Sequence, residues 1–299
     1  NETDEELHFF IGKDGVFSSI FDFKQTMLGQ EGKGWFDHSL PTADELKESI
    51  FQAHERADSI GVLSTIIENH DEPRGVSHYI AEGQVNDTSK KALGTIQILR
   101  KGIPFIYQGQ EIGMENQVFE SVEDFDDIAT INGYHVAKEA GLSEEEALAV
   151  IAKYSRDNAR TPMQWSREPG LGFSDGTAWL ISPKPNVAIN VEDQEKDPNS
   201  ILNYYRQLTA LYRHPLYGNT IRFGDMIPVY RDRENIIAFE RRGNKRLLVI
   251  SNFQNRQATL ELPAPIKTVV LNNTAGLFQE GDQVLELTPY QTVVLELVE

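Results

Sequence analysis

Cysteine is absent from this 299-residue chain, and basic residues are scarce. Without cysteine there is no disulfide framework and no thiolate metal site, which suits a reducing compartment, so we expect a cytoplasmic protein. Lysine and arginine number 28 against 46 aspartates and glutamates, for a formal net charge of −18. A field of that sign repels phosphate backbones and anionic lipid surfaces, which argues against nucleic-acid and membrane partners.

Long hydrophobic runs are lacking too, and no apolar stretch has the length needed to span a bilayer. Hydrophobic residues nevertheless make up 39% of the chain and charged residues 25%, the composition of an ordinary globular protein. The length suggests roughly two domains. A neutral ligand such as a sugar is compatible with the negative charge.

The first part of the chain alternates apolar runs with helical patterns. We expect strands at 17–23, 62–67 and 103–107, with helices at 43–58 and from about residue 88 to Gly102. Apolar, β-branched runs that end in polar clusters are typical of a parallel sheet covered on both faces. In a barrel built this way, functional residues lie at the carboxyl ends of the strands.

Residues 114–197 form a predicted insertion with helices near 122–139 and 143–154, the second opened by Ser143 and Glu146 as a capping box. Asp197 and Pro198 predict the start of the next helix. From Gly218 onward, short β-branched runs alternate with turn residues, and Gly243-Asn244 favours a tight hairpin. We therefore divide the chain into an α/β part, 1–217, and an antiparallel β-sandwich domain, 218–299.

The polar cluster Asn69-His70-Asp71 directly follows the predicted strand 62–67. A carboxylate beside an imidazole can bind a vicinal pair of sugar hydroxyls, and such contacts strengthen in the transition state of glycoside hydrolysis. The alternative is a purely structural turn, which three residues alone do not exclude.

Longer motifs support the sugar interpretation. Residues 69–74 (NHDEPR) resemble the fourth signature region of glycoside hydrolase family 13, the α-amylase superfamily, and 102–114 (GIPFIYQGQEIGM) resemble its region around barrel strand eight. Residues 156–165 (RDNARTPMQW) resemble a block of the oligo-1,6-glucosidase, dextran glucosidase and trehalose-6-phosphate hydrolase subfamily, as do 190–192 and 200–206. The resemblance runs from about residue 17 to the C-terminus and implies the C-terminal part of a (β/α)8 barrel, about strands six to eight.

The resemblance also implies roles for three residues. Asp71 would be the catalytic carboxylate that stabilises the transition state, His70 would contact the same hydroxyls, and Arg160 would bind the sugar of subsite −1. The alternative for Arg160 is an ion pair that anchors a loop. No metal or cofactor is expected. Other residues are expected to be structural: Tyr107, Gln108 and Glu111 at the barrel rim, Trp165 packed beneath the insertion, and Phe21 and Phe23 in the strand core. The alternative for the two phenylalanines is a place on the aglycone side of the site.

The family's nucleophile Asp and acid/base Glu follow strands four and five, upstream of the matching segment. Asp14, Asp22 and Glu31 stand in the wrong context to replace them. We therefore expect the missing N-terminal half of the barrel to come from a second chain or from the rest of a longer polypeptide, and the chain alone to be inactive. An open partial barrel would also leave two sheet edges that proteins normally pair or cover.

The function implied for the complete protein is a retaining exo-α-glucosidase that hydrolyses short α-1,6- or α-1,4-linked gluco-oligosaccharides. Trehalose-6-phosphate hydrolase, sucrose isomerase and trehalose synthase use the same framework and remain alternatives. A different class is also open: a catalytically inactive binding protein, like the ectodomain of amino-acid-transporter heavy chains.

Overall fold

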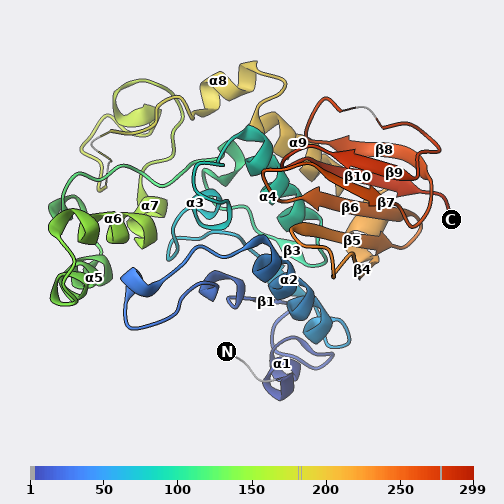
Figure 1. Ribbon diagram of the computed structural model, residues 1–299, viewed down its shortest axis with the longest axis horizontal. Helices are drawn as coiled ribbons and strands as arrows, with labels where there is room; N and C mark the ends of the chain where they lie inside the picture. The colour runs from blue at the N-terminus through green and yellow to red at the C-terminus, as the bar shows by residue number, and fades with distance from the viewer. Residues whose placement is uncertain (1–3, 181, 183, 277) are drawn as a thin grey trace.

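The computed structural model describes residues 4–180, 182, 184–276 and 278–299. A small parallel sheet lies in the middle of the molecule, with the insertion on one side and the β-domain on the other (Figure 1). Within the described part of the chain, no helix has both the length and the apolarity needed to cross a membrane.

The parallel sheet has three strands in the order β1-β2-β3, and its members are β1 (Ile20–Phe21), β2 (Leu63–Thr65) and β3 (Ile103–Pro104). Ile20 pairs with Leu63, and Ser64 pairs with Ile103, both in parallel register. This confirms the predicted parallel neighbours and the expected piece of barrel. The strands are shorter than predicted: β2 covers three residues of the apolar run 62–67, and β3 covers two residues of the run 103–107. Pairing between the strands stops before each apolar run ends.

Helices connect the parallel strands: α2 (Ala43–Ala57) lies between β1 and β2, and α4 (Asp87–Leu99) lies between β2 and β3. Both begin with capping boxes, formed by Thr42 with Glu45 and by Asn86 with Ser89. After β3 and the insertion comes α9 (Ile201–Leu211). The shorter helices of this part are α1 (Asp4–Ile11), which we did not predict, and α3 (Gly75–Tyr79).

The predicted start of α9 at Asp197 and Pro198 is wrong. The Ser200 hydroxyl accepts the Asn203 amide and caps the helix. The Asp197 carboxylate instead accepts the Asn199 amide, which makes a local turn before the helix. Both residue types favour helix starts, so only the path of the backbone decides between them.

The insertion contains two longer helices that pack on each other. The Ser143–Glu146 capping box is confirmed at the start of α6. The helix predicted from 122 is interrupted, because Phe125 is extended and Asp127 caps a new helix. The elements are the 3-10 helix η4 (Val122–Asp124), α5 (Ile128–Glu139), α6 (Glu144–Tyr154), α7 (Asp157–Arg160) and α8 (Val191–Lys196).

The C-terminal part consists of antiparallel sheets, as predicted. Its first element is the short helix α10 (Gly218–Phe223), where we expected no helix. The hairpin at Gly243-Asn244 is confirmed by the pairing of Arg242 with Arg246. A five-stranded sheet has the order β4-β5-β6-β10-β8, and a second sheet pairs β7 with β9. The strands are β4 (Asp225–Val229), β5 (Ile236–Arg242), β6 (Arg246–Asn252), β7 (Ala258–Glu261), β8 (Ile266–Asn272), β9 (Val284–Leu287) and β10 (Thr292–Leu297).

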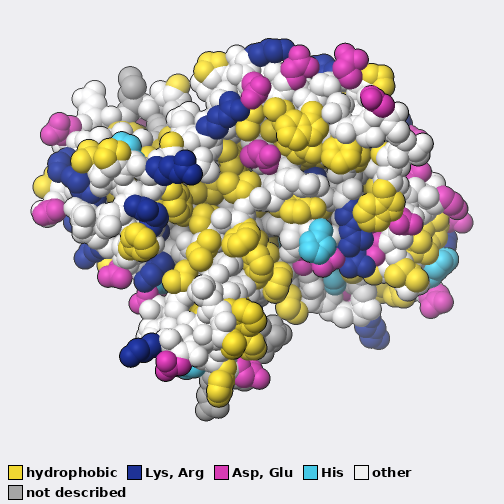
Figure 2. Space-filling model, turned by 180° about the vertical axis from the view of Figure 1, so that it is seen from behind, with side chains coloured by type: hydrophobic (Ala, Val, Ile, Leu, Met, Phe, Trp, Pro, Cys, Tyr) yellow, Lys and Arg dark blue, Asp and Glu magenta, His cyan; other side chains and the backbone are white. Residues whose placement is uncertain are grey.

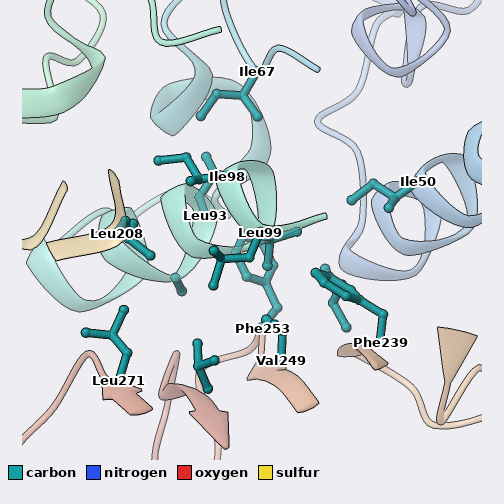
Figure 3. Close-up of a cluster of buried hydrophobic side chains, with 14 of the residues drawn as sticks. Ile50, Ile67, Leu93, Ile98, Leu99, Leu208, Phe239, Val249, Phe253 and Leu271 are labelled. Carbon is teal, nitrogen blue, oxygen red and sulfur yellow. The ribbon is translucent and has the colours of Figure 1, made fainter. Parts of the chain in front are cut away.

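One hydrophobic core joins the two parts of the chain. Helix α4 lies at its centre, with side chains of α2 and α9 on either side and those of β5, β6 and β8 below (Figure 3). Phe239 and Leu99 are both essentially without solvent exposure in this core. Because side chains of β5 and β6 alternate between faces, the opposite face of the same sheet packs on β7 and β9 in a second core.

Hydrophobic side chains also remain exposed. Seen from the side opposite to Figure 1, they gather over the middle of the molecule (Figure 2). Among the exposed large side chains are Phe23 and Phe105, which lie at or beside the parallel strands. Contiguous apolar surface of this kind is typical of a face that binds a ligand or another protein segment.

Candidate active site

The site begins at the turn that follows β2. The Asn69 side-chain oxygen accepts the Asp71 amide at 2.6 Å, which closes a local turn and presents two side chains to solvent. The His70 Nε2 lies 3.3 Å from Asp71 Oδ2, and about half of the Asp71 side chain is exposed. An acceptor carboxylate and an imidazole therefore stand side by side at the carboxyl end of a parallel strand.

A buried ion pair holds this turn from below. Arg74 Nη1 lies 3.1 Å from Glu68 Oε1, and neither side chain has measurable exposure. The same guanidinium donates to the Gln108 carbonyl at 2.7 Å and lies over the Tyr107 ring, 5.5 Å from its centroid. Glu68 Oε2 accepts the Gly75 amide. The turns after β2 and β3 are thus fastened together, and the expected structural role of Tyr107 and Gln108 agrees with these contacts.

Arg160 comes from α7 to the same place. Its Nη2 lies 3.0 Å from Asp71 Oδ1, and its Nε donates to the His70 carbonyl at 2.8 Å. The structure therefore brings together all three residues that we singled out from the sequence: His70, Asp71 and Arg160. The roles assigned to them stay predictions.

Arg156 is a fourth member, and sequence reasoning gave it no role. Its Nη1 also lies 3.0 Å from Asp71 Oδ1, so two guanidinium groups meet on one carboxylate oxygen. The second oxygen, Oδ2, faces His70. The position of Arg156, one helical turn before Arg160 in the same motif, is the signal that could have identified it.

Two buried carboxylates of the insertion hold these arginines. Asp127 Oδ1 lies 2.6 Å from Arg156 Nη2, and Asp157 Oδ1 lies 3.5 Å from Arg160 Nη1. Burial raises the pKa of Asp127, but hydrogen bonds from Arg156 and Thr130 outweigh it and leave that pKa below its usual value. The hydrogen bond to Asp127 raises the pKa of Arg156. Both partners are therefore charged around neutral pH.

An open cleft of about 520 Å³ lies beside the turn. Phe21 and Phe23 line it, as in the alternative considered for these two rings, rather than filling the strand core. The Phe21 ring lies 4.8 Å from the Phe105 ring. Trp165 is half exposed instead of packed beneath the insertion. The polar lining consists of Thr26, Glu68, Asn69, His70, Asp71 and Glu72.

Glu72 is the unusual carboxyl group of this cleft. Burial raises its pKa to about 7, and the neighbouring Asp71 charge adds to the shift, although a hydrogen bond with Thr26 opposes it. With a pKa near neutral pH, Glu72 can hold a proton there and then donate a hydrogen bond.

Metal ligands are not clustered in this region. Across residues 4–180, 182, 184–276 and 278–299, no group of three or more His, Asp or Glu side chains is arranged to hold a metal ion. The arrangement can bind hydroxyl groups through Asp71 and His70 and can orient the carboxylate through the two arginines.

Comparisons with known proteins identify the family of this chain. Residues 2–216 match the family model described as "Alpha amylase, catalytic domain", and residues 236–294 match the "Alpha-amylase SusG C-terminal domain". An oligo-1,6-glucosidase of Halalkalibacterium halodurans is 37% identical over 92% of this chain and 49% of its own length. A trehalose-6-phosphate hydrolase of Bacillus subtilis is 35% identical over 77% of this chain and 41% of its own length.

Solved structures of the same family of enzymes superpose closely on this chain. The isomaltulose synthase of Klebsiella sp. LX3 superposes with a TM-score of 0.90 at 30% identity, over 99% of this chain and 53% of that one. The chain thus spans about half the length of the relatives it matches. Its parallel strands correspond to part of a barrel, as the sequence predicted. A family model that covers most of the chain, together with these relatives, shows that the chain belongs to the α-amylase family, glycoside hydrolase family 13.

Proposed function

We propose that the complete protein is a retaining exo-acting α-glucosidase that hydrolyses short α-1,6- or α-1,4-linked gluco-oligosaccharides. The observation that carries the proposal is the contact of Arg160 with both the Asp71 carboxylate and the His70 carbonyl. His70 and Asp71 themselves line a cleft that also has aromatic rings in its wall. Relatives described as oligo-1,6-glucosidases support the substrate class.

In this proposal Asp71 accepts hydrogen bonds from sugar hydroxyls and stabilises the positive charge that develops on the ring. His70 donates to one of the same hydroxyls. Arg160 orients the carboxylate, a task that suits the rigid fork of donors on a guanidinium. Contacts to the 2-hydroxyl strengthen as the oxocarbenium-like transition state forms, which is why such a site accelerates hydrolysis rather than merely binding the substrate.

The nucleophile and the acid/base residue would come from the other half of the barrel. Retention requires those two carboxyl groups about 5–5.5 Å apart. The order β1-β2-β3 leaves β1 and β3 at the edges of the parallel sheet, where further barrel strands would pair. Residues 1–217 would thus supply one wall of the catalytic barrel, and 218–299 would supply no catalytic residue. The lack of cysteine suits a cytoplasmic location, which we include in the proposal.

Two other activities have specific support. A trehalose-6-phosphate hydrolase and an isomaltulose synthase are among the similar proteins, so hydrolysis of trehalose 6-phosphate and isomerisation of sucrose are second candidates. An inactive binding protein is the remaining alternative. The four-residue arrangement of His70, Asp71, Arg156 and Arg160 argues against it, because a degraded site has no need to hold two cations on one carboxylate.

A product-release assay tests the proposal. The purified chain, alone and mixed with the upstream half of the barrel, is incubated separately with isomaltose, maltose, trehalose 6-phosphate and sucrose. We expect glucose release from isomaltose or maltose by the mixture only. Turnover by the isolated chain would refute the need for the second half. Products from sucrose or trehalose 6-phosphate alone would favour the second candidates, and no product with any substrate would favour the binding protein.

A further inference from the structure

Asp127 lies at the start of α5, outside every motif that identified the family. Only 4% of the residue is exposed. Its Oδ1 accepts from Arg156 Nε at 2.8 Å and lies 2.6 Å from Arg156 Nη2, so one side of the guanidinium is bound through two nitrogens. The remaining nitrogen, Nη1, reaches Asp71 Oδ1 at 3.0 Å. Arg156 thus forms a bridge between Asp127 and Asp71.

The two oxygens of Asp127 have separate partners. Oδ2 accepts the Thr130 amide at 2.9 Å and the Thr130 hydroxyl at 2.8 Å, which is ordinary helix capping. Oδ1 is not needed for the cap and is turned to the arginines, since Arg160 Nη1 also lies 4.0 Å from it. The contact with Arg156 therefore calls for an explanation beyond the stability of α5.

The contact fixes a side chain that would otherwise be mobile. About a third of the Arg156 side chain is exposed, and a free arginine samples many rotamers at such a position. With Asp127 in place, Arg156 and Arg160 both hold Oδ1 of Asp71 and leave Oδ2 directed toward His70. Groups that must meet a transition state are most effective when their supporting partners are held rigidly.

We infer that Asp127 is a positioning residue that sets Arg156 against Asp71, so that the start of α5 in the insertion controls the orientation of the carboxylate in the cleft. The inference deepens the proposed function and rests on the role given there to Asp71. It assigns Asp127 no contact with the sugar. Asp157 holds Arg160 in a similar way at 3.5 Å, but it also accepts the Asp126 and Asp127 amides and so serves the local backbone as well.

The test is Asp127→Asn in the full-length protein. Asparagine keeps an oxygen for the Thr130 amide, and it is as good a cap as aspartate, but it has no charge for Arg156. The matched control is Ser143→Ala, which removes the cap of the neighbouring helix α6 and leaves the arginines untouched. We expect kcat/KM to fall about ten- to a hundredfold for Asp127→Asn, with a loss of melting temperature no larger than that of Ser143→Ala. The control is expected to keep its activity.

Two further measurements separate positioning from general stability. If Asp127 acts through Arg156, the double variant Asp127→Asn/Arg156→Gln is no less active than Arg156→Gln alone, whereas independent effects would multiply and overturn the inference. The second measurement needs no substrate. In protein labelled with ¹⁵N-arginine, the Arg156 Nε–H signal is expected to be protected from exchange in the native protein and in Ser143→Ala, and exposed in Asp127→Asn. An unchanged signal in Asp127→Asn overturns the inference even if the proposed activity itself proves wrong.

Discussion

Asp71 Oδ1 and Arg160 Nη2 lie 3.0 Å apart although 89 residues separate them along the chain. The same arginine donates through Nε to the carbonyl of His70, so it holds both the side chain and the backbone of the turn after β2. The end of a barrel strand and the short helix α7 of the insertion are thereby joined at the cleft.

Asp71→Asn should nearly abolish catalysis in the full-length protein without unfolding it. The amide keeps the shape of the side chain but loses the charge that faces the transition state and the two arginines. We expect a loss of about 3–4 kcal/mol, roughly two to three orders of magnitude in kcat. The control is Glu195→Gln, which removes an exposed carboxylate paired with Arg206. Turnover close to that of the native protein would remove Asp71 from the catalytic set.

Arg160→Lys should be damaging although it keeps the positive charge. A lysine ammonium cannot reach Asp71 and the His70 carbonyl in the same fixed geometry. We expect kcat/KM to drop by an amount equivalent to about 1.5–3 kcal/mol, the range for hydrogen bonds to charged groups. Arg206→Lys, at an exposed ion pair, serves as the control and should change little. Equal kinetics for the two variants would contradict this role for Arg160.

Glu72 should make the free energy of unfolding depend on pH. Its pKa is raised to about 7 in the folded protein, so between its unfolded value and 7 the folded state binds more protons than the unfolded state. Stability contributed by the neutral form is therefore lost as pH rises through that window. Glu72→Gln should match the native protein near pH 4 and be more stable near pH 8, by on the order of 1–3 kcal/mol. Urea unfolding at both pH values measures this, and a constant difference between the two proteins would disprove it.

Phe239→Ala should destabilise both parts of the chain together. The ring is fully buried in the core that joins β5 and β6 to α2, α4 and α9. Truncation of such a ring costs about 3–5 kcal/mol. Phe223→Ala, whose ring is mostly exposed, should shift stability far less. Calorimetry of the two variants would show the expected loss in a single transition, whereas separate transitions for the α/β part and the β-domain would argue against the shared core.

The local signals in the sequence predicted much of the fold. The β-branched runs at 62–67 and 103–107 led to adjacent parallel strands, and Ser143 with Glu146 located the start of α6. These predictions succeeded because a capping box and an apolar, β-branched run are signals carried by residues close together in the chain. The prediction for the start of α9 failed because Asp197 and Ser200 carry equally good local signals. The path of the backbone, which distant contacts determine, makes Ser200 the capping residue.

From the sequence alone we could predict a sugar-binding role for a carboxylate and an imidazole at a strand end and for an arginine in a separate motif. The folded arrangement was needed to see that Arg156 joins Arg160 on one oxygen of Asp71 and that Asp127 contacts Arg156. It was also needed to see that burial raises the pKa of Glu72 to about 7. The physical reason is that ion-pair distances and desolvation depend on how the insertion folds back over the turn after β2. No spacing along the chain specifies either quantity.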